Sequence, residues 1–136
     1  MLHVIRTATV GYSHNVLLKG QLKFLSRYFK VTAISSDEKQ LSFVRKRENV
    51  YVHKVNMVRQ IHVFKDFISL IQLYIVFKRS KPILVHSITP KAGLLSMLAA
   101  KFAGVPIRLH TFTGLIFPTR EGIMRIILIL MDRLLC

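Results

Sequence analysis

The stretch KPILVHSITPKAGLLSMLAAKFAGVPIRLHTFTG, residues 81–114, decides the fold. Its apolar run Ile83–Val85 has the character of a short, fully buried strand. Pro90 suits the first position of a helix, where a backbone N–H would be unpaired anyway, and Gly104 suits the end of that helix. Ile107–Thr111 is expected to be the next strand. A strand, a helix and a second strand in this order predict a crossover between parallel strands.

The same alternation of strands and helices runs through the rest of the chain. We expect strands at Leu2–Val10, Val31–Ile34 and Val50–Val55, helices at Val16–Phe29 and Val63–Lys78, a short basic helix after Asp37, and a last helix starting near Gly122. Such alternation places helices on both faces of a parallel sheet, through right-handed crossovers. The predicted fold class is α/β, a doubly wound, mainly parallel, Rossmann-like sheet, in one domain spanning residues 1–136.

The charge of the chain points to an anionic partner. Of its 136 residues, 21 are Lys or Arg and 6 are Asp or Glu, which gives a net charge of +15, yet 51% are hydrophobic. No aromatic residues are interleaved with the cations as on a platform for bases, so we expect no nucleic acid. An anionic membrane surface fits better. A cationic stripe of the first helix is the expected contact, with a merely solvated face as the alternative; it consists of Lys19, Lys23, Arg27 and Lys30.

Both ends of the chain bear on its location. The lone cysteine, Cys136, excludes a disulfide framework, and the first residues do not form a secretion signal. No uncharged apolar run reaches the roughly 18 residues of a membrane span. We therefore expect a cytoplasmic protein.

The helical pattern of Ile126, Ile127 and Leu130 continues to Cys136 without a residue that would end the helix. This predicts a continuation of the chain and self-association of the isolated piece through the last helix.

Ligands of open parallel sheets bind beside the carboxyl ends of the strands. In this chain that edge is expected to carry Gly11–His14, Ser87–Gly93 and Thr111–Gly114. Neither GxGxxG nor GxxxxGK[ST] occurs, which disfavours a dehydrogenase or a P-loop enzyme. The six histidines form no metal-binding motif, so we expect no metal and no cofactor. His86 borders the edge, whereas His110 lies within a strand and is expected to be structural.

The segment KPILVHSITPKAGLLSMLAAKFAGVPIRLHTFTGLIFPTREG, residues 81–122, with LMDRLLC at residues 130–136, resembles the amino-terminal domain of family 4 glycosyltransferases. It is most similar to bacterial members that build capsular polysaccharide or lipid-linked glycans. NVLLKGQLKFLSRYFKVTAISS, residues 15–36, is compatible with that group. PKAG and HTFTG are the more specific parts of the likeness.

The resemblance implies one half of a two-domain GT-B enzyme, whose first domain holds the acceptor and whose second domain binds the nucleotide-sugar donor. It implies a retaining glycosyltransferase acting on a lipid-linked or polysaccharide acceptor, peripheral on the inner face of the cell membrane, and inactive as the isolated chain. Thr113 and Ile88 stand where many relatives carry histidine, which leaves the catalytic residues unknown. A stand-alone module for a phosphorylated or nucleotide ligand is the alternative. The substrate-binding residues implied are Gly11, Tyr12, Ser13, His14, Lys91, Ala92, Gly93, Thr111, Thr113 and Gly114.

Overall fold

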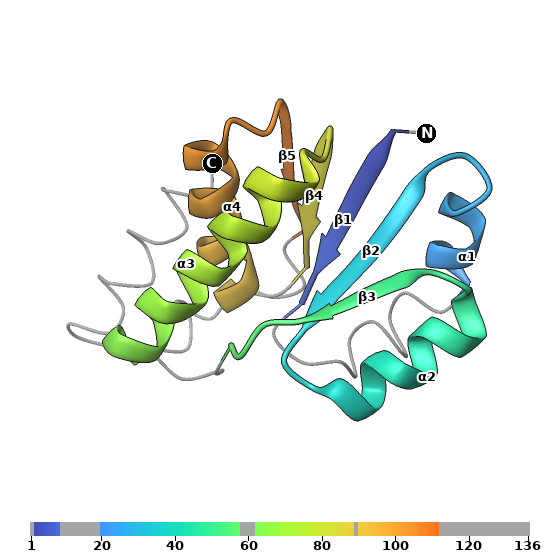
Figure 1. The fold of residues 1–136 in the computed structure, drawn as a ribbon, viewed down its shortest axis with the longest axis horizontal. Coiled ribbons are helices and arrows are strands. Elements are labelled where there is room, and N and C mark those ends of the chain that lie inside the picture. The colour runs from blue at the N-terminus through green and yellow to red at the C-terminus, as the bar shows by residue number, and fades with distance from the viewer. Residues whose placement is uncertain (1, 9–19, 58–61, 89, 112–136) are drawn as a thin grey trace.

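The computed structural model describes residues 2–8, 20–57, 62–88 and 90–111. Five parallel strands form one sheet in the order β3-β2-β1-β4-β5, so the first strand lies at its centre (Figure 1). This confirms the predicted doubly wound α/β fold. The strands are β1 (His3–Thr7), β2 (Lys30–Ser35), β3 (Tyr51–Lys54), β4 (Leu84–Ser87) and β5 (Ile107–His110), and the helices are α1 (Gln21–Leu25), α2 (Glu38–Glu48), α3 (Val63–Ser80) and α4 (Pro90–Ala103).

Two apolar clusters bury the two faces of the sheet. Ile5 and Val85, from the central strands, pack with Phe77 of α3 and with α4. The other face packs with the first two helices, through contacts that include Leu22 of α1 and Leu41 of α2. Each fully buried side chain of this size contributes about 1.5–3 kcal/mol, so the helices are held chiefly by the apolar strands beneath them. The chain therefore reverses its winding between β3 and β4.

The helix expected at Val16–Phe29 is wrong in its last part. Within the described residues, α1 ends at Leu25, and the Ser26 hydroxyl donates to the Lys23 carbonyl oxygen at 2.7 Å. The backbone N–H of Lys30 already donates to the Leu2 carbonyl oxygen at 2.9 Å, as the first bond beside β2. The chain must leave the helix before that point to reach the sheet. Apolar spacing alone did not reveal this constraint.

The other described elements lie near their predicted positions. The long helix expected at Val63–Lys78 extends to Ser80 and ends at Lys81, whose φ of 49° lies in the left-handed region. The strand expected at Ile83–Val85 is shifted to Leu84–Ser87. The shift follows from pairing, since β4 forms its ladder with β1 through Ser87, whose partner is Thr7.

Glu48 at the end of α2 connects the first two helices. Its side chain is 2% exposed, and its carboxylate accepts hydrogen bonds from the backbone N–H of Gly20 at 2.7 Å and of Lys23 at 3.1 Å. Arg47 pairs with the same carboxylate at 3.1 Å. A carboxylate at a helix amino terminus satisfies otherwise unpaired N–H groups and favours the helix dipole. A residue of α2 thus supplies the cap of α1.

We expect Glu48→Ala to lower the free energy of unfolding by about 1–3 kcal/mol, because it removes a buried carboxylate that accepts from the backbone N–H groups of Gly20 and Lys23. The matched control is Glu38→Ala on the same helix, whose side chain is 83% exposed and lies 4.0 Å from Lys54. That change should cost less than about 0.5 kcal/mol. Urea unfolding followed by circular dichroism measures both. Equal losses for the two variants would contradict the capping role.

Candidate functional site

The carboxyl ends of β1 and β4 meet at the point where the strand order reverses, the usual ligand-binding place of such sheets. Hydroxyl groups line this point on the face covered by α3 and α4. Thr7 Oγ1 lies 2.7 Å from Ser96 Oγ of α4, and Ser87 Oγ lies 2.7 Å from His110 Nδ1. Thr7, Ser87 and Ser96 are all fully buried. The first pair ties β1 to α4, and the second ties β4 to β5.

Gly93 and His110 are in close contact. A Cβ atom on Gly93 would overlap the imidazole ring of His110, so a residue with a side chain cannot stand there unless the ring moves. Gly93 is among the substrate-binding residues that the resemblance implies. In the structure the His110 ring fills the space that its missing side chain leaves, so that space is not open to a ligand. His110 is thus a packing residue bonded to Ser87, in line with the structural role expected for it.

The opposite face of the same edge carries a different set of groups. Arg6 and His86 are register partners on adjacent strands, so their side chains leave the sheet on one face. Ala33, the partner of Arg6 on β2, belongs to the core beneath α1 and α2, which identifies that face. His86 Nε2 lies 2.7 Å from Thr111 Oγ1. Ser35, at the end of β2, is fully buried on this face.

Three causes lower the pKa of His86 from 6.5 to about 4: burial first, then the positive charge of Arg6, then the neighbouring His110. His86 is therefore neutral at pH 7. A neutral imidazole offers one donor and one acceptor, and Thr111 engages one of these two. Burial likewise lowers the pKa of Arg6, which remains a cation.

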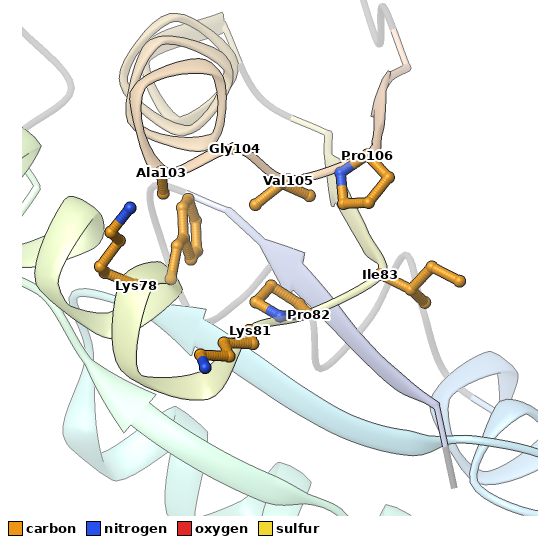
Figure 2. A pocket seen from close by; sticks show the side chains of 9 residues that line it. Lys78, Lys81, Pro82, Ile83, Ala103, Gly104, Val105 and Pro106 are labelled. Atoms are coloured by element: carbon orange, nitrogen blue, oxygen red, sulfur yellow. The ribbon is translucent and has the colours of Figure 1, made fainter.

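A pocket of about 420 Å³ lies at the other end of the sheet, where Pro82 and Ile83 lead into β4 and Val105 and Pro106 lead into β5 (Figure 2). Its polar groups include the side chain of Lys78. Because it lies at the amino ends of the strands, it is remote from the switch point. A second hollow, of about 430 Å³, does lie beside carboxyl ends and is lined by Ser36, Asn56, Met57, Lys65 and Ile68.

The structure places only some of the residues predicted for the site. Lys91 lies in the first turn of α4, and Ala92 is fully buried in the core, so its side chain cannot line a cleft. Thr111 is at the edge and contacts His86. Six of the predicted residues lie outside the described residues and stay predictions: Gly11, Tyr12, Ser13, His14, Thr113 and Gly114.

Sequence reasoning missed Arg6. It is 6% exposed in the central strand, where every other residue from Val4 to Thr7 is also buried. The signal was available in the sequence, since HVIRT places a lone guanidinium inside a strand that reads as core. A charge at such a position is rarely buried unless something pairs with it.

The described residues contain no group of three or more side chains suited to a metal ion. Among the helices of the described part, none has the length and apolar character needed to cross a membrane. The predicted self-association through Ile126, Ile127 and Leu130 falls outside the described ranges and stays a prediction.

We expect the free energy of unfolding to fall as the pH drops from about 6.5 toward about 4. In this window the unfolded chain protonates His86, whereas the folded chain, with a pKa of about 4, does not. His3, whose pKa burial also lowers, acts in the same direction. His86→Gln should flatten the dependence, with the exposed His53→Gln as control. Urea unfolding at several pH values measures it, and an unchanged slope in His86→Gln would contradict the assignment.

Solved structures share this fold. The amino-acid identity is 17% to MurG from Acinetobacter baumannii, with a TM-score of 0.63 over 88% of this chain and 37% of that one. It is also 17% to a UDP-GlcNAc 2-epimerase from Methanocaldococcus jannaschii, with a TM-score of 0.60 over 98% and 37% of the two chains. At such identities the likeness concerns the fold alone.

Comparison of the amino-acid sequence with known proteins identifies the family of the chain. The chain is 37% identical over 119 residues to the capsular polysaccharide biosynthesis glycosyltransferase CapM of Staphylococcus aureus, covering 87% of this chain and 30% of CapM. It is 43% identical over 65 residues to an Escherichia coli UDP-Gal:alpha-D-GlcNAc-diphosphoundecaprenol alpha-1,3-galactosyltransferase, covering 48% of this chain and 17% of that enzyme. The chain thus spans under a third of either relative. The family described as glycosyl transferase 4-like matches residues 2–131, and the chain belongs to that family.

Proposed function

We propose that this chain is the acceptor-side domain of a retaining glycosyltransferase that moves a sugar from a nucleotide-sugar donor to a lipid-linked or polysaccharide acceptor. The observation that carries the proposal is the match of the glycosyl transferase 4-like family to residues 2–131. The relatives named above support the acceptor class, since one is named for capsular polysaccharide and the other for a diphosphoundecaprenol-linked sugar. The second half of the GT-B architecture would supply most contacts to the donor.

The groups at the described edge suit binding more than proton transfer. Asp37 is the carboxylate that directly follows β2, and it caps α2 by accepting from the backbone N–H of Lys39 at 3.0 Å and of Gln40 at 3.2 Å. At the ends of β1, β2 and β4, the polar side chains are the hydroxyls of Thr7, Ser35 and Ser87, the imidazole of His86 and the guanidinium of Arg6. Hydroxyl and imidazole groups can both donate to and accept from the hydroxyls of a sugar. The domain's part in transfer would be to hold and orient the acceptor, which lowers the barrier by positioning.

A stand-alone module that binds a phosphorylated or nucleotide ligand is the second candidate. The buried cation Arg6 favours an anionic ligand under either hypothesis. The two differ in what the chain needs for function. A module would bind a nucleotide tightly by itself, whereas an acceptor-side domain would leave most of the donor contacts to another domain.

We expect the purified chain to show no sugar transfer and only weak affinity for nucleotides, because it spans 30% of the length of CapM. The measurement is transfer of radiolabelled sugar to a diphosphoprenyl-linked acceptor, together with calorimetric titration of UDP. The gene product that extends past residue 136, if the gene continues, is the positive control. Turnover by the 136-residue chain alone would contradict the proposal that a second domain binds the donor. Tight UDP binding without any turnover would favour the stand-alone nucleotide-binding module.

Membrane contact is the second part of the proposal, and the described residues offer two surfaces for it. Lys23 lies in α1 and is exposed, but Arg27 lies in the turn after that helix and Lys30 begins β2, so the predicted stripe does not follow one helix. Lys19 is outside the described residues. On the other face of the sheet, α3 exposes apolar side chains at helical spacing: Phe64, Phe67, Ile68 and Ile71, whose exposed fractions are 78%, 61%, 54% and 42%.

We favour the α3 surface. Phe102 of α4 is 65% exposed and joins Ile71 in lining one hollow, so the apolar area continues onto the next helix. Lys65 is exposed beside it, and Lys78 and Arg79 are exposed at the end of the helix. Aromatic side chains flanked by cations suit insertion at the boundary of anionic lipid headgroups. Each cation near such a surface adds about 1 kcal/mol of attraction.

We expect Phe64→Ser with Phe67→Ser to reduce binding to anionic vesicles at least about tenfold, since each buried Phe is worth about 1.5–3 kcal/mol. Phe43→Ser, an exposed position on α2, is the control. Sedimentation with anionic and with neutral vesicles provides the measurement. Loss of binding only when Lys19, Lys23, Arg27 and Lys30 are changed to Gln would assign the contact to the predicted stripe. Equal binding to neutral and anionic lipid would count against both surfaces.

A further inference from the structure

Within the part of the chain that the structure describes, no group of opposite charge compensates the buried guanidinium of Arg6. Arg6 is 6% exposed, its Nε is buried without a hydrogen-bond partner, and no ion pair to it occurs within the described part of the chain. The pKa of Arg6 is lowered by burial alone, with no acid opposing the shift. A buried cation is retained when it is paired, because its removal from water is otherwise costly. Its position in the central strand, beside the switch point, makes a ligand the natural partner.

The acids of the described residues are engaged elsewhere. Glu48 accepts from backbone N–H groups at the start of α1, and Asp37 caps α2. Asp66 accepts from the backbone N–H of His62 at 3.1 Å, and Glu38 is an exposed neighbour of Lys54. Within the described residues, then, the protein itself does not supply the counter-charge of Arg6.

A second buried polar group without a partner lies on the same face. Ser35 is fully buried, and its Oγ has no hydrogen-bond partner. Thr7 is paired with Ile34 on β2, which places Ser35 one residue beyond it, toward the carboxyl edge. Ser35 shares its face with Ala33, the register partner of Arg6. Two neighbouring strands therefore present unpaired polar groups to one place.

His86, on β4 at the other side of β1, is the third polar group beside Arg6 and Ser35. It is the register partner of Arg6, and its ring contacts Thr111 at 2.7 Å. A guanidinium, a hydroxyl and a neutral imidazole combine one fixed positive charge with additional donors. That combination matches the oxygens of a phosphate group, for which the planar fork of arginine is well suited. Among the described residues, no carboxylate lies in this set to repel an anion.

We propose that Arg6, with Ser35 and His86 beside it, binds a phosphate group of a diphosphate ligand on the α1 and α2 face of the sheet. The choice of a diphosphate rests on the proposed function, in which both the nucleotide-sugar donor and a lipid-linked acceptor carry that group. The oxyanion site itself follows from the buried, unpaired groups and does not depend on sugar transfer.

Calorimetric titration with inorganic pyrophosphate, combined with thermal unfolding, tests the site. Pyrophosphate should bind the chain and raise its Tm. Arg6→Met should weaken binding at least tenfold, while the Tm without ligand stays equal or rises, because an uncompensated charge has been replaced by an apolar side chain. Arg45→Met is the matched control, since it removes the same charge from an exposed position on α2 and should leave binding within about twofold.

Further variants keep the test decisive. If Arg6→Met does not fold, two milder variants replace it. Arg6→Lys retains the charge but loses the planar guanidinium, and Ser35→Ala removes one hydroxyl. Each should weaken pyrophosphate binding several-fold. UDP and a short-chain prenyl diphosphate then distinguish the donor from the acceptor as the source. Unchanged pyrophosphate binding in Arg6→Met would overturn the site. The site would also be overturned if Arg6→Met strongly lowered the Tm and either Glu121→Gln or Asp132→Asn lowered it to the same extent, because this would show an internal ion pair to Arg6. Pyrophosphate binding by this chain, together with no sugar transfer by the longer gene product, would leave the site standing and refute only the proposed function.

Discussion

A parallel sheet must be covered on both faces, and this requirement governs the rest of the structure. With β1 at the centre, Ile5 needs cover from α3 and α4, while Ala8, one position past the strand, packs with residues beneath α1 and α2. The chain satisfies the requirement by reversing its direction of winding after β3. That reversal leaves the carboxyl ends of β1 and β4 adjacent with no crossover helix between them. The edge at which we predict a ligand therefore results from the way both faces of the sheet are covered.

The two faces of that edge differ in whether their buried polar groups have hydrogen-bond partners. On the α4 side, hydroxyls and an imidazole pair and pack within the protein, as in the contact between Ser87 and His110 and the close fit of His110 on Gly93. On the α1 and α2 side, buried polar groups such as Arg6 Nε and Ser35 Oγ have no partner. Satisfied buried groups give rigidity, whereas unsatisfied ones at a ligand edge are typical of recognition. The assignment of the binding face rests on this contrast.

The strand-helix-strand order could be predicted because each element has its own local signal. Pro90 and Gly104 bound α4 through backbone chemistry that needs no tertiary contact. The end of α1 could not be predicted in this way, because it is set by the distant bond from Lys30 to Leu2. The site is predicted at the carboxyl edge of the sheet and stays a prediction, whereas the space beside Gly93 is filled by the His110 ring. An absent side chain does not reveal whether a ligand or a neighbouring ring will use the space, and only the register of β4 and β5 brings His110 there.

The central position of β1 also has a consequence for synthesis. β1 leaves the ribosome before both of its partner strands: it pairs with β2 through His3 and Lys30, but its other partner, Leu84–Ser87, lies far along the chain. During translation one edge of β1 therefore stays open while β2, α2, β3 and α3 emerge. An open apolar edge is a template for pairing between nascent chains. Slow translation before β4 would prolong that exposure, so the order of the strands makes this fold dependent on how quickly its middle is made.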